Sequence, residues 1–177
     1  MIIDQTRLPG ELLTLRIKSV RQLVEAILSL RVRGAPALGA AGAYGIALAA
    51  ELCRAVSAPE VMADLEIAAD MIRGARPTAV NLSWGVDRAL SAAAAAAKEA
   101  ETEAETGVAT RAATATSAGT AEDVRQAALA EAQAIAEEDI AVNRALGRIG
   151  AKLIEDGDRI LTHCNAGALA TGGYGTA

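Results

Sequence analysis

Ile160-Leu-Thr-His-Cys-Asn-Ala-Gly-Ala-Leu-Ala-Thr-Gly-Gly-Tyr-Gly-Thr176 is the stretch that decides the fold, because an apolar run, reactive side chains and glycines stand together there. Asp156-Gly-Asp158 predicts a turn, Arg159 to Thr162 a short buried strand, and Asn165 to Gly167 a loop that opens into an Ala/Gly-rich helix. Such strand-to-helix crossings bind ligands in α/β proteins, because the N–H groups at the helix start are unpaired. The thiol of Cys164 would face such a ligand.

The composition restricts both the core and the partners. Of the 177 residues, 52% are hydrophobic and 2% aromatic with no Phe, so the core must consist of Ala, Leu, Ile and Val, which favour closely packed helices. A net charge of −5 argues against nucleic acid or an anionic membrane as a partner, because both bind clustered Lys and Arg. We expect a cytoplasmic protein, because the N-terminus lacks a signal-peptide pattern, no uncharged run reaches roughly 20 residues, and two cysteines make no disulfide framework.

The pattern upstream of residue 156 is helical. A short β lead around the Pro9-Gly10 turn is followed, over residues 19–30, by apolar residues at three- and four-residue spacing, which predicts a core-facing helix. The last of the upstream helices is expected to be long and to reach residue 155, with a break at Gly147 or Gly150. Helix starts are predicted at Ser19, Pro36, Pro59, Thr78 and Thr120.

Two arginines stand directly before proline-marked helix starts. Arg33 precedes Gly34-Ala-Pro36, and Arg76 precedes Pro77. Guanidinium donors beside the unpaired N–H groups of a helix start are the geometry that binds a phosphate. The spacing alone leaves two interpretations open, one shared anion site or two separate solvated arginines. The glycines in the helix after Pro36 cost roughly 1 kcal/mol each relative to Ala, so we expect a backbone or a ligand to approach that helix closely.

Three segments resemble the successive signatures of the S-methyl-5-thioribose-1-phosphate isomerases of methionine salvage. The wider family also includes ribose-1,5-bisphosphate isomerases and the regulatory subunits of the initiation-factor guanine-nucleotide exchange complex. The Asp4-Gln-Thr6 lead and the Gly173-Tyr-Gly-Thr176 ending are similar to the methylthioribose enzymes as well. The three segments are Arg33-Gly-Ala-Pro-Ala-Leu-Gly39, Arg76-Pro-Thr-Ala-Val-Asn-Leu82 and Leu161-Thr-His-Cys-Asn-Ala-Gly-Ala-Leu-Ala-Thr171.

The resemblance implies roles for five residues. Arg33, Gly34 and Ala35, joined by Arg76, would hold the substrate phosphate, and Cys164 would be the catalytic cysteine. The implied reaction converts S-methyl-5-thioribose 1-phosphate to S-methyl-5-thioribulose 1-phosphate with no metal and no redox cofactor, in an enzyme that is a homodimer by resemblance. The residues alone leave open the alternative that Cys164 is an inert buried thiol.

The histidine next to that cysteine is expected to have a structural or pocket-wall role. His163 has no carboxylate and no second histidine nearby in sequence that would make it a base. Two positions depart from the family pattern. Ser83 stands where an aromatic is common, and Gly172 stands where a larger apolar residue is usual, which is expected to loosen the last helix.

The resemblance divides the chain after residue 156. Residues 1–156 are expected to form a mainly α N-terminal domain with a flexible loop over 106–119, and residues 157–177 to form the first strand and helix of a truncated Rossmann-like α/β domain. Family members continue through that domain, which supplies a catalytic aspartate, a glutamine and an Asn-Lys pair, so we expect negligible isomerase activity from this chain alone. The alternatives are a ribose-1,5-bisphosphate isomerase and a non-catalytic regulatory or phosphate-ligand-binding module.

Overall fold

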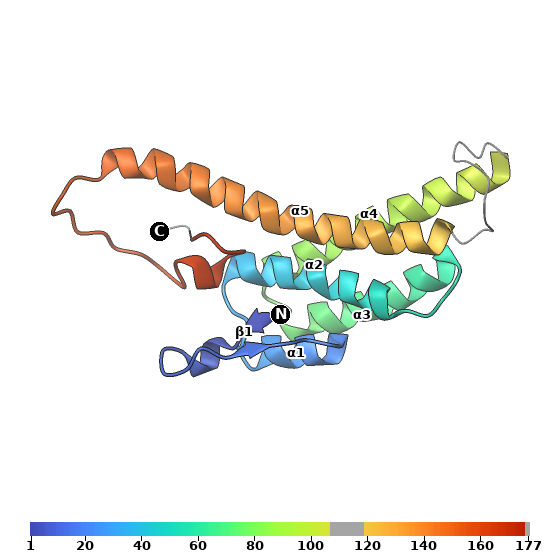
Figure 1. The fold of residues 1–177 in the computed structure, drawn as a ribbon, viewed down its shortest axis with the longest axis horizontal. Coiled ribbons are helices and arrows are strands. Elements are labelled where there is room, and N and C mark those ends of the chain that lie inside the picture. The colour runs from blue at the N-terminus through green and yellow to red at the C-terminus, as the bar shows by residue number, and fades with distance from the viewer. Residues whose placement is uncertain (107–118, 176–177) are drawn as a thin grey trace.

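The computed structural model describes the backbone of residues 1–106 and 119–175 and the side chains of residues 1–98 and 121–175. Most of the loop predicted over residues 106–119 therefore lies outside the described residues. The described part is mainly helical, with two long helices packed along a group of shorter ones (Figure 1). Its α-helices are α1 (Val20–Leu28), α2 (Ala35–Leu52), α3 (Ala58–Ala75), α4 (Val80–Thr106) and α5 (Gly119–Gly150).

The predicted helix starts and stops agree with these bounds. The Ser19 side chain caps α1 by accepting a hydrogen bond from the backbone N–H of Gln22 at 3.2 Å. Pro36 and Pro59 lie in the first turns of α2 and α3, where a missing N–H leaves no bond unmade. Helix α5 ends at Gly150, one of the two predicted break points, and a 3₁₀ turn over Ala151–Leu153 follows it.

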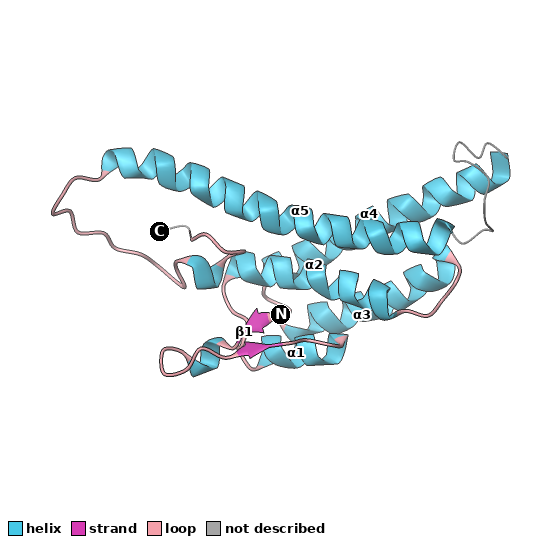
Figure 2. Ribbon diagram, viewed as in Figure 1, coloured by secondary structure: helices cyan, strands magenta, loops and turns pink. Residues whose placement is uncertain are grey.

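A small antiparallel hairpin precedes the helices, which confirms the predicted β lead. Strand β1 (Ile2–Ile3) pairs with β2 (Thr14–Leu15), with Ile2 opposite Leu15 (Figure 2). A 3₁₀ helix over Gln5–Arg7 lies between the two strands.

Helix α2 is the centre of the core and is covered by α3, α4 and α5 (Figure 1). It is long and apolar enough to cross a membrane by length and composition, but 56% of it is buried inside the protein, as in a core helix. Gly39 and Gly42 lie where α4 approaches, as a Cβ at Gly42 would lie 2.6 Å from the carbonyl oxygen of Leu82. A Cβ at Gly85 of α4 would clash with the backbone of Gly39. The close approach predicted for this helix is therefore a contact between two backbones.

The C-terminal segment differs from the prediction. Residues 159–162 form no strand in the structure, and Ala168–Ala170 forms a 3₁₀ turn instead of the start of an α-helix (Figure 2). The side chains of Ile160 and Leu161 are 64% and 97% exposed. A strand is stable only beside another strand, and the one sheet among the described residues consists of β1 and β2 and does not include this segment.

Candidate functional site

The start of α2 has the backbone geometry of an anion site. Gly34 is the N-cap residue with a φ of 104°, a conformation that favours glycine, and its carbonyl accepts the first helical hydrogen bond from the N–H of Leu38 at 2.9 Å. Pro36 has no N–H, so the N–H groups of Ala35 and Ala37 are those left at the helix start. The positive end of the helix dipole lies behind them.

The C-terminal segment returns from the end of α5 and lies against this helix start (Figure 1). The guanidinium of Arg33 donates a hydrogen bond to the side-chain oxygen of Asn165 at 3.0 Å. A Cβ at Gly34 would lie 2.5 Å from the carbonyl oxygen of Ala170, so only glycine leaves room for the segment. The structure thus brings the Arg33 loop and the Cys164 loop together, although 132 residues separate Arg33 from Asn165.

Cys164 itself is exposed and has a φ of 63°. This left-handed conformation is uncommon for a residue other than glycine, and it occurs where the surrounding structure imposes it. The thiol is not buried by the described part of the chain. His163 next to it is exposed as well, and among the described residues no hydrogen bond or ion pair joins it to a carboxylate.

Gln5 connects the N-terminal lead to both loops. Its side-chain amide donates to the carbonyl of Leu169 at 2.8 Å and to the carbonyl of Arg33 at 3.4 Å. Its backbone N–H donates to the carbonyl of Arg31 at 3.1 Å. The Asp4-Gln-Thr6 lead therefore supports the site directly, which its sequence did not reveal.

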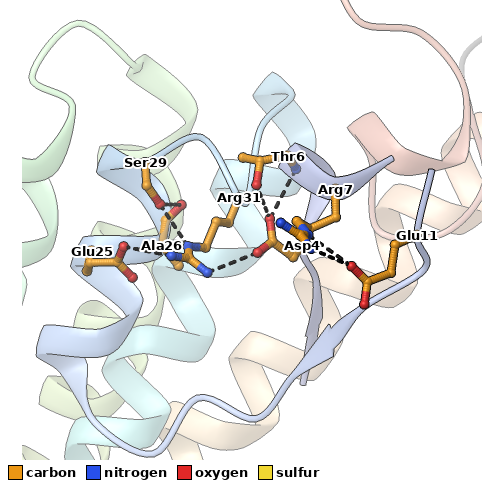
Figure 3. Close-up of polar contacts among 8 residues, drawn as sticks. All are labelled: Asp4, Thr6, Arg7, Glu11, Glu25, Ala26, Ser29 and Arg31. Carbon is orange, nitrogen blue, oxygen red and sulfur yellow. Dashed lines mark hydrogen bonds and ion pairs between the residues drawn. The ribbon is translucent and has the colours of Figure 1, made fainter. Parts of the chain in front are cut away.

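The position of this lead depends on the buried carboxylate of Asp4, which is 2% exposed. Figure 3 shows its contacts with Thr6 and Arg31. It accepts hydrogen bonds from the Thr6 hydroxyl at 2.6 Å and the Thr6 N–H at 3.1 Å, and it pairs with the Arg31 guanidinium at 2.9 Å. These hydrogen bonds from Thr6, with the charge of Arg31, hold the pKa of Asp4 below its ordinary value of 3.8 against the effect of burial. Arg31 also reaches Glu25 at 3.3 Å, so the network joins the lead to α1.

Arg76 lies in the turn before α4 and takes no part in the contact between Arg33 and Asn165. Arg76 is partly buried, and its carbonyl accepts the N–H of Ala79 in the turn that leads into α4. The first turn of α4 packs on the first turns of α2, since a Cβ at Gly39 would lie 3.3 Å from the carbonyl oxygen of Asn81. Among the described residues, no hydrogen bond or ion pair connects Arg76 with Arg33 or Cys164.

Two hollows lie beside these residues rather than at them. A cavity of about 1010 Å³ follows α2 between the N-terminal hairpin, α5 and the C-terminal segment, and its walls are mostly apolar, including Ala37, Tyr44 and Leu169. A smaller hollow of about 470 Å³ is lined by Pro77 and Trp84. The Trp84 ring also lies 5.2 Å from the guanidinium carbon of Arg88.

The charged run Glu137-Glu-Asp139 of α5 is expected to be a solvated face, and Glu137 and Glu138 are exposed as expected, although Glu138 pairs with Arg88 at 2.6 Å. The sequence interpretation missed Asp139 and Asn143, and Asp139 accepts the N–H of Gly172 at 2.6 Å. Asn143, one turn further on, is 5% exposed. Among the described residues, no group of three His, Cys, Asp or Glu side chains could hold a metal ion.

Fold and site together define a mainly helical domain whose central helix begins at an arginine-flanked turn beside an exposed cysteine. The chain belongs to the initiation factor 2 subunit family, whose model matches residues 31–172. It is 47% identical over 176 residues to the methylthioribose-1-phosphate isomerase of Desulforudis audaxviator and 45% identical over 176 residues to that of Syntrophotalea carbinolica. These matches cover 99% of this chain but 44% and 45% of the two relatives, so the chain spans less than half of their length.

Two solved structures are similar to this fold. One is described as translation initiation factor eIF-2B, subunit delta, from A. fulgidus, with a TM-score of 0.77 and 46% identity over 98% of this chain and 44% of that one. The other is 5-methylthioribose 1-phosphate isomerase from Pyrococcus horikoshii, with a TM-score of 0.76 and 34% identity over 98% of this chain and 43% of that one. The resemblance stated from the sequence motifs is thereby confirmed at the level of the family.

Proposed function

We propose that this chain supplies the phosphate-binding site and the reacting cysteine of an S-methyl-5-thioribose-1-phosphate isomerase. The observation that carries the proposal is the contact between the two motifs, in which Arg33 donates to Asn165 and Gly34 packs on Ala170. That contact joins the helix start proposed to bind phosphate to the loop that holds Cys164. Relatives named methylthioribose-1-phosphate isomerase match the chain over nearly all of its length.

In this proposal the phosphate binds at the start of α2. The free N–H groups of Ala35 and Ala37 and the guanidinium of Arg33 are donors suited to a dianion. Substrate would replace Asn165 as the acceptor for Arg33, since a phosphate is the stronger partner. Arg76 would add a second positive charge from the turn before α4, which packs on the same end of α2.

The reaction needs an acid and a defined path for one hydrogen. The substrate is a cyclic aldose with a phosphate on its anomeric oxygen, so the ring cannot open spontaneously to an aldehyde. An acid must assist the opening before hydrogen moves from C2 to C1 to give the ketose. Cys164 would assist proton handling or stabilise developing charge at the reacting carbons, and its exposed thiol faces outward from this chain.

The rest of the enzyme would come from sequence that corresponds to the uncovered part of the relatives. We place the domain boundary after residue 156, with residues 157–177 beginning a Rossmann-like domain. The exposed side chains of Ile160 and Leu161 support this, because a strand in a parallel sheet buries such residues. The proposal includes negligible activity of residues 1–177 alone, a homodimer and a cytoplasmic location.

Ligand binding to residues 1–177 tests the phosphate site without catalysis. Titration with S-methyl-5-thioribose 1-phosphate should shift the NMR signals of the amides at Ala35 and Ala37. Arg33→Ala should weaken binding about 10- to 100-fold, the effect of losing one or two charge-assisted hydrogen bonds. Arg54→Ala is the matched control, because Arg54 is exposed just past the opposite end of α2. Equal affinity in both variants would refute the site.

Two other functions stay open as alternatives to the proposed isomerase. A ribose-1,5-bisphosphate isomerase would need a second phosphate site, and turnover of that substrate in place of methylthioribose 1-phosphate would favour it. A regulatory module is favoured by the likeness to the structure described as an eIF-2B subunit. In that case Cys164→Ala would leave ligand and partner binding intact, and a fusion of this chain to the remaining half of a relative would not isomerise either sugar.

A further inference from the structure

Two side chains of α5 hold the C-terminal segment, and neither belongs to the predicted site. The Asp139 carboxylate accepts hydrogen bonds from the Gly172 N–H at 2.6 Å and from the Asn143 amide at 3.2 Å. The same Asn143 amide donates to the carbonyl of Tyr174 at 2.9 Å. Residues one helical turn apart on α5 therefore bind the backbone on both sides of Gly173.

The Asn143 and Thr171 side chains of this attachment are buried and paired, while the bond between Asp139 and Gly172 is exposed. Asn143 is 5% exposed and Thr171 is 8% exposed. The Thr171 hydroxyl donates to the carbonyl of Tyr174 at 2.9 Å, and the Arg144 guanidinium carbon lies 5.7 Å from the centre of the Tyr174 ring. A buried amide that loses its partner costs about 1–3 kcal/mol, so the pair on α5 strongly favours one position of the segment.

We infer that Asp139 and Asn143 are positioning residues for the Cys164 loop, an inference that rests on the proposed function. Their hold on residues 172–174 places Ala170, two residues earlier, against Gly34 at the start of α2. The loop before it then meets Arg33 through Asn165. The thiol acquires a defined position relative to the phosphate, and a misplacement of about 1 Å at a reacting group can cost ~100-fold in rate.

Hydrogen exchange in residues 1–177 tests the positioning without any ligand. The amides to follow are those of Ala170 and Thr171, whose own acceptors are the carbonyls of Gly167 and Ala168 and not groups of α5. Asp139→Ala and Asn143→Ala should each speed their exchange at least ~10-fold, because the segment is released from α5. Core amides of α4 serve as the reference and should not change, which separates local release from global unfolding.

Glu137→Ala is the matched control. Glu137 is an exposed carboxylate on the same helix, two residues from Asp139, and among the described residues no hydrogen bond or ion pair joins it to the C-terminal segment. This variant should leave the exchange of Ala170 and Thr171 unchanged. Unchanged exchange in both Asp139→Ala and Asn143→Ala would overturn the inference, as would equal acceleration in the control.

A kinetic readout distinguishes positioning from a merely structural role. The protein to use is residues 1–177 joined to the remaining half of the Desulforudis audaxviator relative. Both variants should lower kcat about 10- to 100-fold with KM within about twofold, because the phosphate site keeps Arg33 while the thiol is misplaced. Normal kcat in variants with faster exchange would also overturn the inference. An inactive parent fusion would contradict the proposed function instead, and the exchange result would then decide the positioning.

Discussion

Arg33 and Cys164 are both exposed side chains, and the backbone conformation beside each supports its place in the candidate site. Sequence reasoning selected Arg33 because Gly34 and Pro36 follow it, and the structure shows the resulting helix start with Gly34 in a conformation that favours glycine. The contact with Asn165 could not be predicted by spacing, because the two residues are 132 positions apart. The sequence therefore predicted the local structure at Arg33 but not the contact that Arg33 makes with a distant residue.

The two cysteines should differ in reactivity. Cys53 is partly buried and donates to the Asp64 carboxylate at 3.0 Å, and burial, helped by that carboxylate, raises the pKa of its thiol. Iodoacetamide should therefore modify the exposed Cys164 at least ~10-fold faster at pH 8, since only the thiolate reacts. Mass spectrometry of the labelled peptides measures both rates in one sample. Faster labelling of Cys53 would contradict the burial described for it.

The Asp4 carboxylate should make the fold sensitive to acid. A carboxylate whose pKa is lowered by folding contributes stability above its unfolded pKa, and that contribution is lost as pH falls through the folded pKa. The urea midpoint of the wild-type chain should therefore fall between about pH 5 and 3, and that of Asp4→Asn should fall less. Asp156→Asn, in an exposed turn, should behave as wild type. An unchanged acid slope in Asp4→Asn would contradict the role of the network.

At the scale of elements, the spacing of apolar residues predicted α1, α3 and α5, because each buries a stripe in a common core, and Pro36 predicted the start of α2. The strand predicted over 159–162 is absent, because strand formation depends on neighbours that the described residues do not supply. The sequence of helix α5 also contains a pattern that the prediction did not use. Its buried stripe of Val124, Ala128, Ala132 and Ile135 continues in helical spacing to Asp139 and Asn143, and polar residues on a buried stripe imply a specific partner.

The contact between α2 and α4 should tolerate no added methyl group. Gly85→Ala would push a Cβ into the backbone of Gly39, so we expect a loss of about 1–3 kcal/mol in the free energy of unfolding. Gly74→Ala in α3 is the matched control, because a Cβ there meets nothing within 4 Å and alanine favours helix by up to about 1 kcal/mol. Urea unfolding of the two variants measures both effects. A Gly85→Ala variant as stable as Gly74→Ala would contradict the backbone contact between α2 and α4.

At the scale of the whole molecule, the chain folds a helical core and then returns its C-terminal segment to the start of α2 (Figure 1). Gln5, Asp139 and Asn143 hold that segment from two sides. The family and the candidate residues could be predicted from short motifs, because those motifs are local. The supports of the site could not, because they pair residues that only the folded chain brings together.

One measurement tests most directly whether this chain supplies the phosphate site and the reacting cysteine. It is the isomerisation of S-methyl-5-thioribose 1-phosphate by residues 1–177 joined to the remaining half of the Desulforudis audaxviator relative. The joined protein should turn over the sugar, while Cys164→Ala should lower kcat at least ~100-fold and Arg33→Ala should lower kcat/KM about 10- to 100-fold. Residues 1–177 alone should give no measurable turnover. Full activity of the Cys164→Ala protein, or no activity in the joined parent protein, would contradict the proposed function.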